Sequence, residues 1–272
     1  MKRVTSICIV GSDKICRELL YEPFKDKIPK EFLKYKYRGG QLNLPLEPGS
    51  EELSQAMKIT MDYNLHPTLF SKTHYSKSEI EKCDYFKLNI PYPLELEGTY
   101  ASDYGTQYTG GCPSCGLGGK PAGDVLVDRK FVKKHKIGNV CPDIYVSEEI
   151  KNLIESNNLT GISFTNRMKD YKGREMPEYY IMDIQSILPQ MSSSTWLNYT
   201  DGASYEECGH NVVYLRSDVQ YEKEKLDGAL DFNLTEEYID NYRLREIIVS
   251  AKVRKLFKEH KIYSFFFPVA IV

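Results

Sequence analysis

The chain has 272 residues, 41% of them hydrophobic and 27% charged, and its formal net charge is -2. These values are typical of a globular protein that forms one large or two modest domains. The near-neutral charge argues against general nucleic-acid binding driven by neutralisation of phosphates. No apolar stretch approaches the roughly 18 residues that span a bilayer, so we expect no membrane segment.

The N-terminus predicts a strand rather than a secretion signal. A basic pair, Lys2 and Arg3, precedes an apolar run that is too short for a signal peptide and has no small-residue cleavage site. The chain has seven cysteines, an odd number, and two of them are spaced as Cys-x-x-Cys. This pattern favours a reducing, cytoplasmic location over a disulfide framework.

Residues 1–100 predict a mixed α/β N-terminal region. Ser50 is a typical helix N-cap, and the apolar residues that follow it at helical spacing predict a buried face: Leu53, Ala56, Met57 and Met61. Ser76 and Glu79 form a capping-box pattern for a short helix. Residues 85–90 then predict a strand that ends at a proline.

Two related strand–helix–strand units are predicted next, at residues 101–190 and 191–272. In each unit a serine caps a helix that has an apolar stripe. The predicted strands are 124–128 and 159–164 in the first unit and 211–215 and 262–267 in the second, and the capping residues are Ser147 and Ser250. The same order of elements favours an internal repeat over chance similarity of a common motif. A further strand is predicted at residues 179–184.

The first unit contains a turn with the sequence Cys-Pro-Ser-Cys-Gly, at residues 112–116. Two thiolates three residues apart can bind one zinc ion from a tight turn, and the glycine permits a positive φ angle there. The second unit contains a degenerate form of this turn, in which Tyr205 replaces the first cysteine. We therefore expect a structural zinc site in the style of a zinc ribbon, with the ligands Cys112, Cys115, Cys208 and His210.

Two other interpretations of the cysteine turn remain open. The turn is either a relic that has lost its metal or a redox pair, although the βαβ context of a thioredoxin-type motif is absent. Cys141 is a substitute ligand for the zinc site. The remaining cysteines, Cys8, Cys16 and Cys83, are expected to be small buried hydrophobic residues.

Catalytic motifs are weak in this sequence, and we expect no enzyme. Residues 192–195 together with Glu222 and Glu224 are similar to the Ser-Thr-Ser and Glu-x-Glu elements of ADP-ribosyltransferases, which makes such an enzyme one alternative. A basic cluster at residues 129–136 is either a solvated edge or a contact for an acidic partner. Together with a zinc ribbon, this cluster gives a second alternative, an accessory protein that contacts nucleic acid.

The Cys-x-x-Cys-Gly turn and its distant second form resemble those of the bacterial double-CxxCG motif proteins. Residues 146–154, 161–164 and 179–184 also resemble the immunity-type domains of polymorphic toxin systems, and the similarity covers roughly residues 75–272. The predicted elements give an α+β fold class, and the resemblance implies a non-enzymatic protein that neutralises a cognate toxin by binding it. We therefore expect a protein partner and neither nucleic acid nor a membrane, while the oligomeric state stays open.

Overall fold

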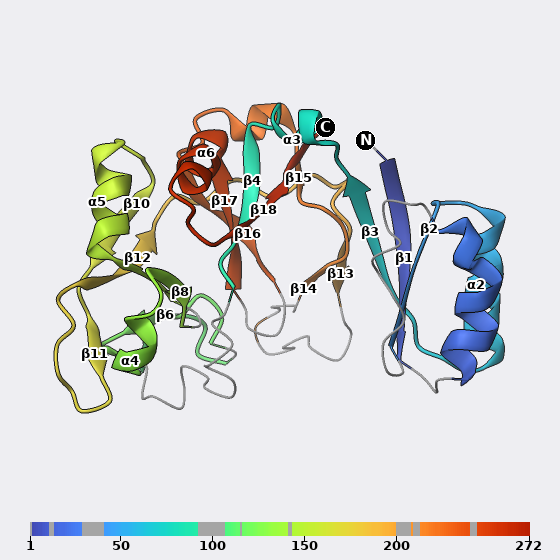
Figure 1. Cartoon of the computed structure of the whole chain (residues 1–272), viewed down its shortest axis with the longest axis horizontal. Helices are drawn as coiled ribbons and strands as arrows, with labels where there is room; N and C mark the ends of the chain where they lie inside the picture. Colours follow the sequence, from blue (N-terminus) through green and yellow to red (C-terminus); the bar gives the residue numbers. More distant parts are fainter. Residues whose placement is uncertain are drawn as a thin grey trace. The chain divides into compact units, whose positions relative to one another are not determined.

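The computed structural model describes residues 2–10, 14–28, 41–91, 107–114, 116–140, 143–199, 208, 213–239 and 244–272. It contains both helices and strands, which confirms the predicted α+β class. The chain divides into two compact units (Figure 1). Unit 1 comprises Met1–Lys82, Thr195–Leu197 and Arg216–Asp218, and unit 2 comprises Cys83–Ser194, Asn198–Leu215 and Val219–Val272. Among the described residues, no helix has the length and apolar character needed to cross a membrane.

Unit 1 is a three-stranded antiparallel sheet with helices on one face (Figure 1). The strand order is β2-β1-β3, with β1 at Lys2–Val10, β2 at Gln41–Leu46 and β3 at Thr68–His74. The helices are η1 (Ile15–Tyr21), α1 (Glu22–Phe24), η2 (Lys25–Lys27), α2 (Glu51–Asp62) and α3 (Lys77–Ile80). The capping box predicted for α3 is confirmed, because Ser76 and Glu79 bond to each other's backbone amides.

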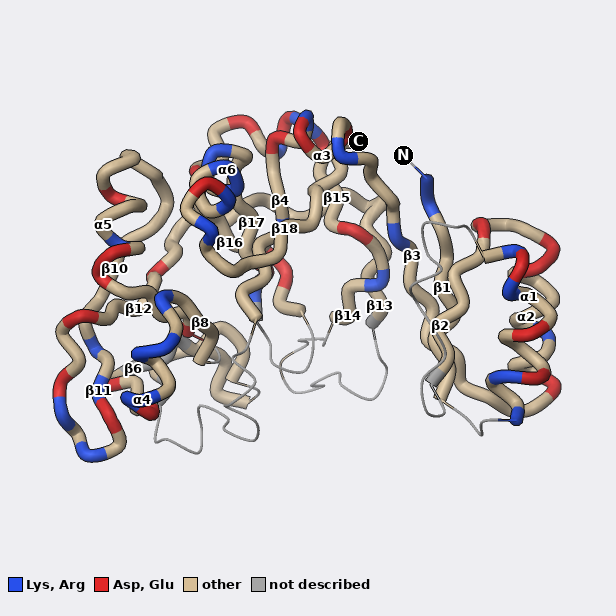
Figure 2. The backbone as a smooth tube through the Cα atoms, viewed as in Figure 1, with Lys and Arg blue, Asp and Glu red and all other residues tan. Residues whose placement is uncertain are grey.

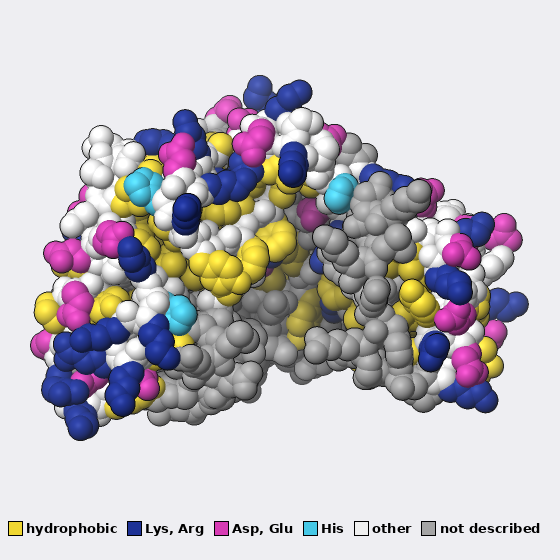
Figure 3. Space-filling model, in the orientation of Figure 1, with side chains coloured by type: hydrophobic (Ala, Val, Ile, Leu, Met, Phe, Trp, Pro, Cys, Tyr) yellow, Lys and Arg dark blue, Asp and Glu magenta, His cyan; other side chains and the backbone are white. Residues whose placement is uncertain are grey.

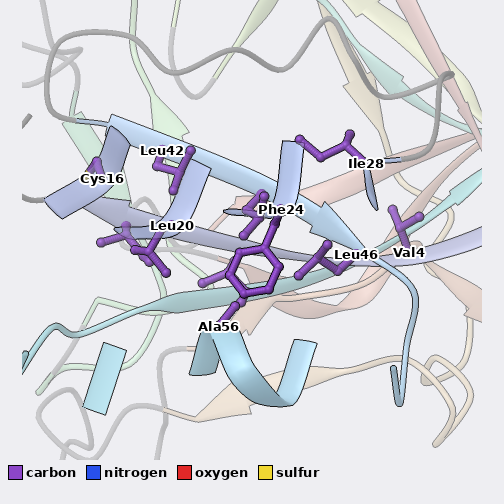
Figure 4. Close-up of a cluster of buried hydrophobic side chains, with 11 residues drawn as sticks. Val4, Cys16, Leu20, Phe24, Ile28, Leu42, Leu46 and Ala56 are labelled. Carbon is purple, nitrogen blue, oxygen red and sulfur yellow. The ribbon is translucent and has the colours of Figure 1, made fainter. Parts of the chain in front are cut away.

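The core of unit 1 lies between the sheet and its helices (Figure 4). Its buried hydrophobic residues come mainly from β1, η1, α1, β2 and α2: Val4, Ile7, Ile9, Cys16, Leu20, Phe24, Ile28, Leu42, Leu44, Leu46 and Ala56. The N-terminal strand is therefore confirmed, and so is the buried position of Cys16. Cys8 and Cys83, by contrast, are only half-buried, so the expectation for these two cysteines is wrong in degree.

Helix α2 confirms its predicted N-cap, because the Ser50 side chain accepts a hydrogen bond from the Leu53 amide at 3.1 Å. The predicted buried face is wrong at Met61, which is 74% exposed. The neighbouring Thr60 is buried instead, and its hydroxyl donates to the Met57 carbonyl at 2.7 Å. A threonine can occupy a core position in a helix when its hydroxyl bonds to the preceding turn.

Two short segments from the second half of the chain complete unit 1. The Ser71 amide of β3 donates to the Arg216 carbonyl at 2.6 Å, and the Thr73 amide donates to the Asp218 carboxylate at 2.7 Å. The Arg216 guanidinium also lies 5.0 Å from the centre of the Phe70 ring. These contacts give two backbone amides of β3 acceptors at the edge of the sheet, where an edge strand would otherwise be open to other chains.

Unit 2 contains two main sheets (Figure 1). One has the order β10-β12-β9-β8, with β8 at Ile137–Asn139, β9 at Ile144–Ser147, β10 at Ile162–Thr165 and β12 at Tyr179–Ile184. The other has the order β13-β14-β16-β17-β4-β18, with β4 at Tyr85–Asn89, β13 at Leu197–Tyr199, β14 at Val213–Leu215, β16 at Phe232–Ile239, β17 at Leu244–Ser250 and β18 at Phe265–Pro268.

Among the described residues of unit 2, three strand pairs and four helical segments complete the fold. The pairs are β5 (Gln107–Thr109) with β6 (Lys120–Ala122), β7 (Val125–Val127) with β11 (Met168–Asp170), and β15 (Gln220–Tyr221) with β19 (Ala270–Ile271). The helical segments are α4 (Arg129–Val132), α5 (Glu148–Ser156), η7 (Lys223–Leu226) and α6 (Ala251–Glu259).

Two blocks of unit 2, residues 125–170 and residues 220–271, have the same arrangement. In each block the first and last strands pair in parallel, β7 with β11 and β15 with β19. An antiparallel hairpin, β8-β9 or β16-β17, leads into a helix, α5 or α6, which is followed by an edge strand, β10 or β18. The order β10-β12-β9-β8 in the first block therefore corresponds to β18-β4-β17-β16 in the second.

The register of the central strand is also the same in both blocks. Tyr179 of β12 pairs with Ser147, the residue before α5. Tyr85 of β4 pairs with Ser250, the residue before α6. In both blocks the serine that pairs with the tyrosine directly precedes the helix. The two helices therefore start at the same position relative to the central strand.

A cation over an aromatic ring repeats at the position that follows each of these tyrosines. In the first block, Lys151 Nζ lies 5.2 Å from the centre of the Tyr180 ring. In the second, the Arg254 guanidinium lies 4.8 Å from the centre of the Phe86 ring. Lys151 and Arg254 are both the fourth residue of their helices, so the correspondence extends to side-chain packing.

The central strand of each sheet comes from outside its own block. β12 completes the sheet of the first block and precedes the second block in sequence, whereas β4 completes the sheet of the second block and precedes the first. The two strands are similar in sequence, Tyr-Phe-Lys-Leu-Asn in β4 and Tyr-Tyr-Ile-Met-Asp at the start of β12. Each block thus receives the strand that precedes the other block, and the two blocks exchange their first strands.

The blocks also touch each other directly through Asp231. Its carboxylate accepts hydrogen bonds from the Thr160 amide at 2.9 Å, from the Thr160 hydroxyl at 3.1 Å and from the Ser250 hydroxyl at 2.7 Å. A Cβ atom on the adjacent Gly161 would lie 2.1 Å from the Phe232 carbonyl oxygen, so only glycine fits this approach of the two blocks.

Three sequence-based placements differ from the structure. The strand predicted at 85–90 exists as β4, but it belongs to unit 2 and not to the N-terminal unit. The strand predicted at 211–215 exists as β14, yet the second-block counterpart of β7 is β15, because β15 and not β14 pairs in parallel with the last strand. Ser147 occupies the N-cap position of α5, but its side chain makes no capping hydrogen bond.

Candidate binding surface

The cysteine turn is held by backbone bonds and by two glycines. The Gly116 amide donates to the Cys112 carbonyl at 2.7 Å, and the Cys112 amide donates to the Leu117 carbonyl at 2.8 Å. Gly111 and Gly116 have φ angles of +81° and +71°. A Cβ atom on Gly111 would lie 2.5 Å from the Gly119 nitrogen, so the turn requires glycine at this position. This tight conformation is the kind that positions thiolate ligands.

The predicted zinc ligands are only partly covered by the described residues. Cys112 and Cys208 are described, and both are half-buried. Cys115, His210 and the substitute ligand Cys141 lie outside the described residues. Within the described ranges, no group of three or more histidine, cysteine, aspartate or glutamate residues could hold a metal. The zinc site therefore stays a prediction.

The glutamates named for an ADP-ribosyltransferase have different surroundings. Hydrogen bonds from Lys225 and then from Ser192 lower the pKa of Glu222 to about 2. Lys225 Nζ lies 2.9 Å from the Glu222 carboxylate and also donates to the Gln190 carbonyl at 3.0 Å. Glu224, in contrast, is exposed. Glu222 is therefore an ionised acceptor, and its contacts help to hold η7 against the loop that contains Gln190 and Ser192.

The basic cluster at residues 129–136 lies on α4 and the turn that follows it. Two of its cations are paired: Arg129 lies 3.6 Å from the Glu178 carboxylate, and Lys136 lies 2.6 Å from that of Glu149. Phe131 and Val132 from the same segment are buried. The segment thus packs one face into the first block and presents partly neutralised charge on the other.

The strongest candidate for a binding surface is an aromatic row formed by Tyr263, just before β18, and by Phe265 and Phe267 of β18. Their side chains are 68%, 45% and 46% exposed. The rings of Tyr263 and Phe265 are 5.5 Å apart and meet edge to face. Figure 3 shows hydrophobic side chains exposed around β18 on unit 2, beside lysine and arginine side chains. Single exposed apolar residues are common on protein surfaces, but three large rings exposed at alternate positions are not.

Phe266 explains why its neighbours face outward. Its ring packs at 6.3 Å from Phe86 and at 6.1 Å from Phe257 of α6, in both cases edge to face. Because side chains alternate along a strand, the packing of the half-buried Phe266 against α6 directs Phe265 and Phe267 to the opposite face of the sheet.

The first block has polar residues where the second has the row. Phe164 and Phe266 occupy equivalent positions, because Phe164 pairs with Met182 of β12 and Phe266 pairs with Leu88 of β4. The residues on either side of Phe164 are Ser163 and Thr165, and both are exposed. The scaffold therefore does not require aromatic residues at Phe265 and Phe267.

The helices of the two blocks also differ in charge (Figure 2). Helix α5 has three glutamates and one lysine, which gives a formal charge of -2. Helix α6 has one arginine, three lysines and one glutamate, which gives +3. Two further basic residues, His260 and Lys261, separate α6 from the aromatic row, and both are exposed. The row thus lies directly after a basic helix end.

The sequence of residues 262–267 predicts a strand, but it does not identify the aromatic row as an exposed surface. A run of three phenylalanines has no hydrophobic alternation, so periodicity cannot show which ring is outside. The comparison of Ser163-Phe164-Thr165 with Phe265-Phe266-Phe267 needs the strand register, because Phe164 is 17 residues after Ser147 and Phe266 is 16 residues after Ser250.

Comparison with models of known protein families finds no match, and a search of curated proteins also finds none.

Proposed function

We propose that this chain is a non-enzymatic bacterial protein that acts in the cytoplasm by binding another protein, and that this partner is a cognate toxin which it neutralises. The observation that carries the proposal is the aromatic row, Tyr263, Phe265 and Phe267. Exposed aromatic residues are enriched at protein interfaces, where a few large rings supply most of the binding energy. The resemblance to immunity-type domains supplies the class of partner.

The cysteine content supports the location. The sequence has an odd number of cysteines, seven, and Cys16 lies buried in the core of unit 1. A reducing compartment suits such a chain, because thiols stay unoxidised there.

We also propose a structural zinc ion on the turn at Cys112, with Cys115, Cys208 and His210 as the other ligands. The positive φ angles of Gly111 and Gly116 support this, because they give the backbone a shape suited to thiolate ligation. Elemental analysis of purified protein is expected to give one equivalent of zinc, and Cys112→Ser is expected to remove it, whereas Cys83→Ser is not. A wild-type content well below one equivalent would dismiss the metal and leave the binding function untouched.

The binding function is tested with the neighbouring open reading frame, expected to encode a large secreted protein with a variable C-terminus. Expression of that C-terminal domain alone is expected to arrest growth, and co-expression of this chain is expected to restore it. The two proteins are expected to co-purify after inactivation of the toxin. Growth arrest that this chain fails to relieve, together with no co-purification, would contradict the proposal.

A further inference from the structure

We propose that the aromatic row receives an extended segment of the partner that is both apolar and acidic, laid along β18 next to the basic turn formed by Lys258, His260 and Lys261. This inference rests on the proposed function and names the surface and the chemistry of the partner segment. Three observations carry it: the edge position of β18, the divergence of the two blocks and the charge around the row.

The first observation is that β18 is the terminal strand of its sheet in the described part of the chain. The Val269 amide donates to the Tyr85 carbonyl at 3.0 Å. Because bonded pairs alternate in antiparallel sheets, the main-chain groups of Phe266 point away from β4. Pro268 has no N–H and ends the row of possible donors. A partner strand therefore has room for main-chain bonds along residues 264–267, beside the exposed rings.

The second observation is the divergence of the two blocks at matched positions. Natural proteins usually protect an edge strand with charged residues or a bulge. The edge strand β10 carries the polar Ser163 and Thr165 on its exposed face, whereas β18 carries Phe265 and Phe267 there. The first block shows that this fold is compatible with a polar edge, so the aromatic edge has a use other than folding.

The third observation concerns Lys261, which follows the C-cap of α6 with a φ angle of +53°. The equivalent residue after α5 is Asn158, with a φ angle of +50°. Asparagine tolerates this left-handed conformation, and lysine does so less well. A lysine held at such a position, beside the exposed His260, indicates that positive charge there serves binding rather than stability.

The charge pattern favours carboxylates over phosphates as the partner's anions. Lys87, whose ammonium lies 5.7 Å from the Phe267 ring centre, is also 3.0 Å from the Glu246 carboxylate. Lys255 lies 3.9 Å from Glu259. Alternating signs suit a protein segment that has charges of its own, and they repel a continuous polyphosphate.

The test uses the full chain and the toxin domain of the neighbouring reading frame with its active site inactivated. The double variant Phe265→Ser/Phe267→Thr gives β18 the residues of the first block. We expect its dissociation constant to rise about 100-fold, as for loss of two central aromatic contacts. The matched control Ser163→Ala/Thr165→Ala alters the same positions of the first block and is expected to leave binding within about three-fold of wild type.

The contribution of charge is measured by the association rate, and that of strand pairing by hydrogen exchange. Lys261→Asn is expected to slow association several-fold at low salt and to lose this effect at high salt, because screening weakens steering. Hydrogen exchange is expected to show protection of the amides of Ser264 and Phe266, which point away from β4, when the toxin is bound. An unchanged exchange rate for these amides in a saturated complex would overturn the proposed segment.

The outcomes distinguish the inference from the proposed function. If wild-type protein does not bind the toxin domain, the proposed function fails and this inference fails with it. If wild type binds and the double variant binds equally well, only the inference fails. Because both changed side chains are exposed, the double variant is expected to keep the wild-type circular dichroism spectrum, so a loss of binding would not be a loss of fold. Binding of a single-stranded oligonucleotide that the double variant loses would overturn the assignment of a protein segment.

Discussion

The first and second blocks of unit 2 share a framework and differ on their surfaces. Helices α5 and α6 have nine residues each, start after a serine that pairs with a tyrosine of the central strand, and end before a residue with positive φ. Their formal charges are nevertheless -2 and +3. Positions that pack are thus similar in kind, whereas positions that face solvent have diverged.

This comparison shows one arrangement of elements that is present twice within unit 2. One copy of this arrangement, made of one strand followed by a hairpin, a helix and an edge strand, would close its sheet with the strand of a second copy. In the present chain the two copies are covalently joined, and β4 and β12 take each other's places. Since neither block has its central strand in its own sequence, we expect them to fold as one cooperative unit.

The largest effect is expected from cutting the chain between the blocks. A protease site inserted at Gly173, an exposed turn residue between β11 and β12, separates β4 from the second block and β12 from the first. The two cleaved fragments are expected to co-elute on native size exclusion, because each supplies a central strand to the other. After separation in denaturant and removal of the denaturant, each fragment alone is expected to stay partly unfolded. The sum of the two far-UV circular dichroism spectra should then be weaker than the spectrum of the cleaved complex. Fragments that part under native conditions would contradict the exchange.

The next effect is expected in the core of the second block. Phe86 of β4 is fully buried and packs against Phe266 and Arg254. Phe86→Ala should lower the free energy of unfolding by about 3–5 kcal/mol, since it removes a ring and leaves a cavity. The matched change Tyr180→Ala in β12 removes a half-buried ring and should cost about half as much. Urea denaturation measures both, and equal losses would contradict the expectation that the deeper burial of Phe86 makes it the more costly ring to remove.

A smaller effect is expected at the contact between the blocks. Burial of Asp231 opposes ionisation, but hydrogen bonds from Ser250 and Thr160 outweigh it and lower the pKa of the carboxyl. Asp231→Ala should cost about 1.5–3 kcal/mol at neutral pH, the range for hydrogen bonds to a charged group. A lowered pKa means that this stability is present above the ordinary pKa near 4 and is lost as the pH falls through the native value.

The control for Asp231 is the equivalent residue of the first block. Ser147 donates its amide to the Lys136 carbonyl, as Ser250 does to the Asp231 carbonyl. Lys136 makes only an exposed ion pair with Glu149, so Lys136→Ala should cost about 0.5 kcal/mol or less. If Asp231→Ala loses as much stability as wild type when the pH is lowered, another group is responsible for the pH dependence.

The two capping serines should respond differently. The Ser250 hydroxyl accepts a bond from the Val253 amide and donates to Asp231, so Ser250→Ala should cost about 1–2 kcal/mol. The Ser147 hydroxyl is buried and has no hydrogen-bond partner among the residues that the structure describes, so its removal should be neutral or slightly stabilising. Thermal denaturation of both alanine variants measures the difference. A larger loss at Ser147 would show that its hydroxyl has a partner in solution.

The caps illustrate how far the sequence could be interpreted. Serine followed by helical spacing predicts both helices, and strands rich in tyrosine and isoleucine are equally legible, because both depend on local preference. The exchange of β4 and β12 was not predictable in this way, since a residue's neighbours along the chain do not specify which distant strand it pairs with. The predictions for Met61 and Ser147 were wrong for a related reason. Burial and hydrogen bonding at these positions depend on packing partners that are distant in sequence.

The smallest effect is expected at Lys261, where stability and binding should change in opposite directions. Lys261→Asn restores the residue type that the first block has at Asn158, in the same left-handed conformation. Relief of this strain should raise the free energy of unfolding by about 0.5–1 kcal/mol, while loss of the charge should slow association with the toxin. Asn158→Lys is the reciprocal control, expected to destabilise by a similar amount without affecting binding. If Lys261→Asn were both less stable and equally fast in binding, the lysine would have a structural role, and the charge next to the aromatic row would carry no weight in recognition.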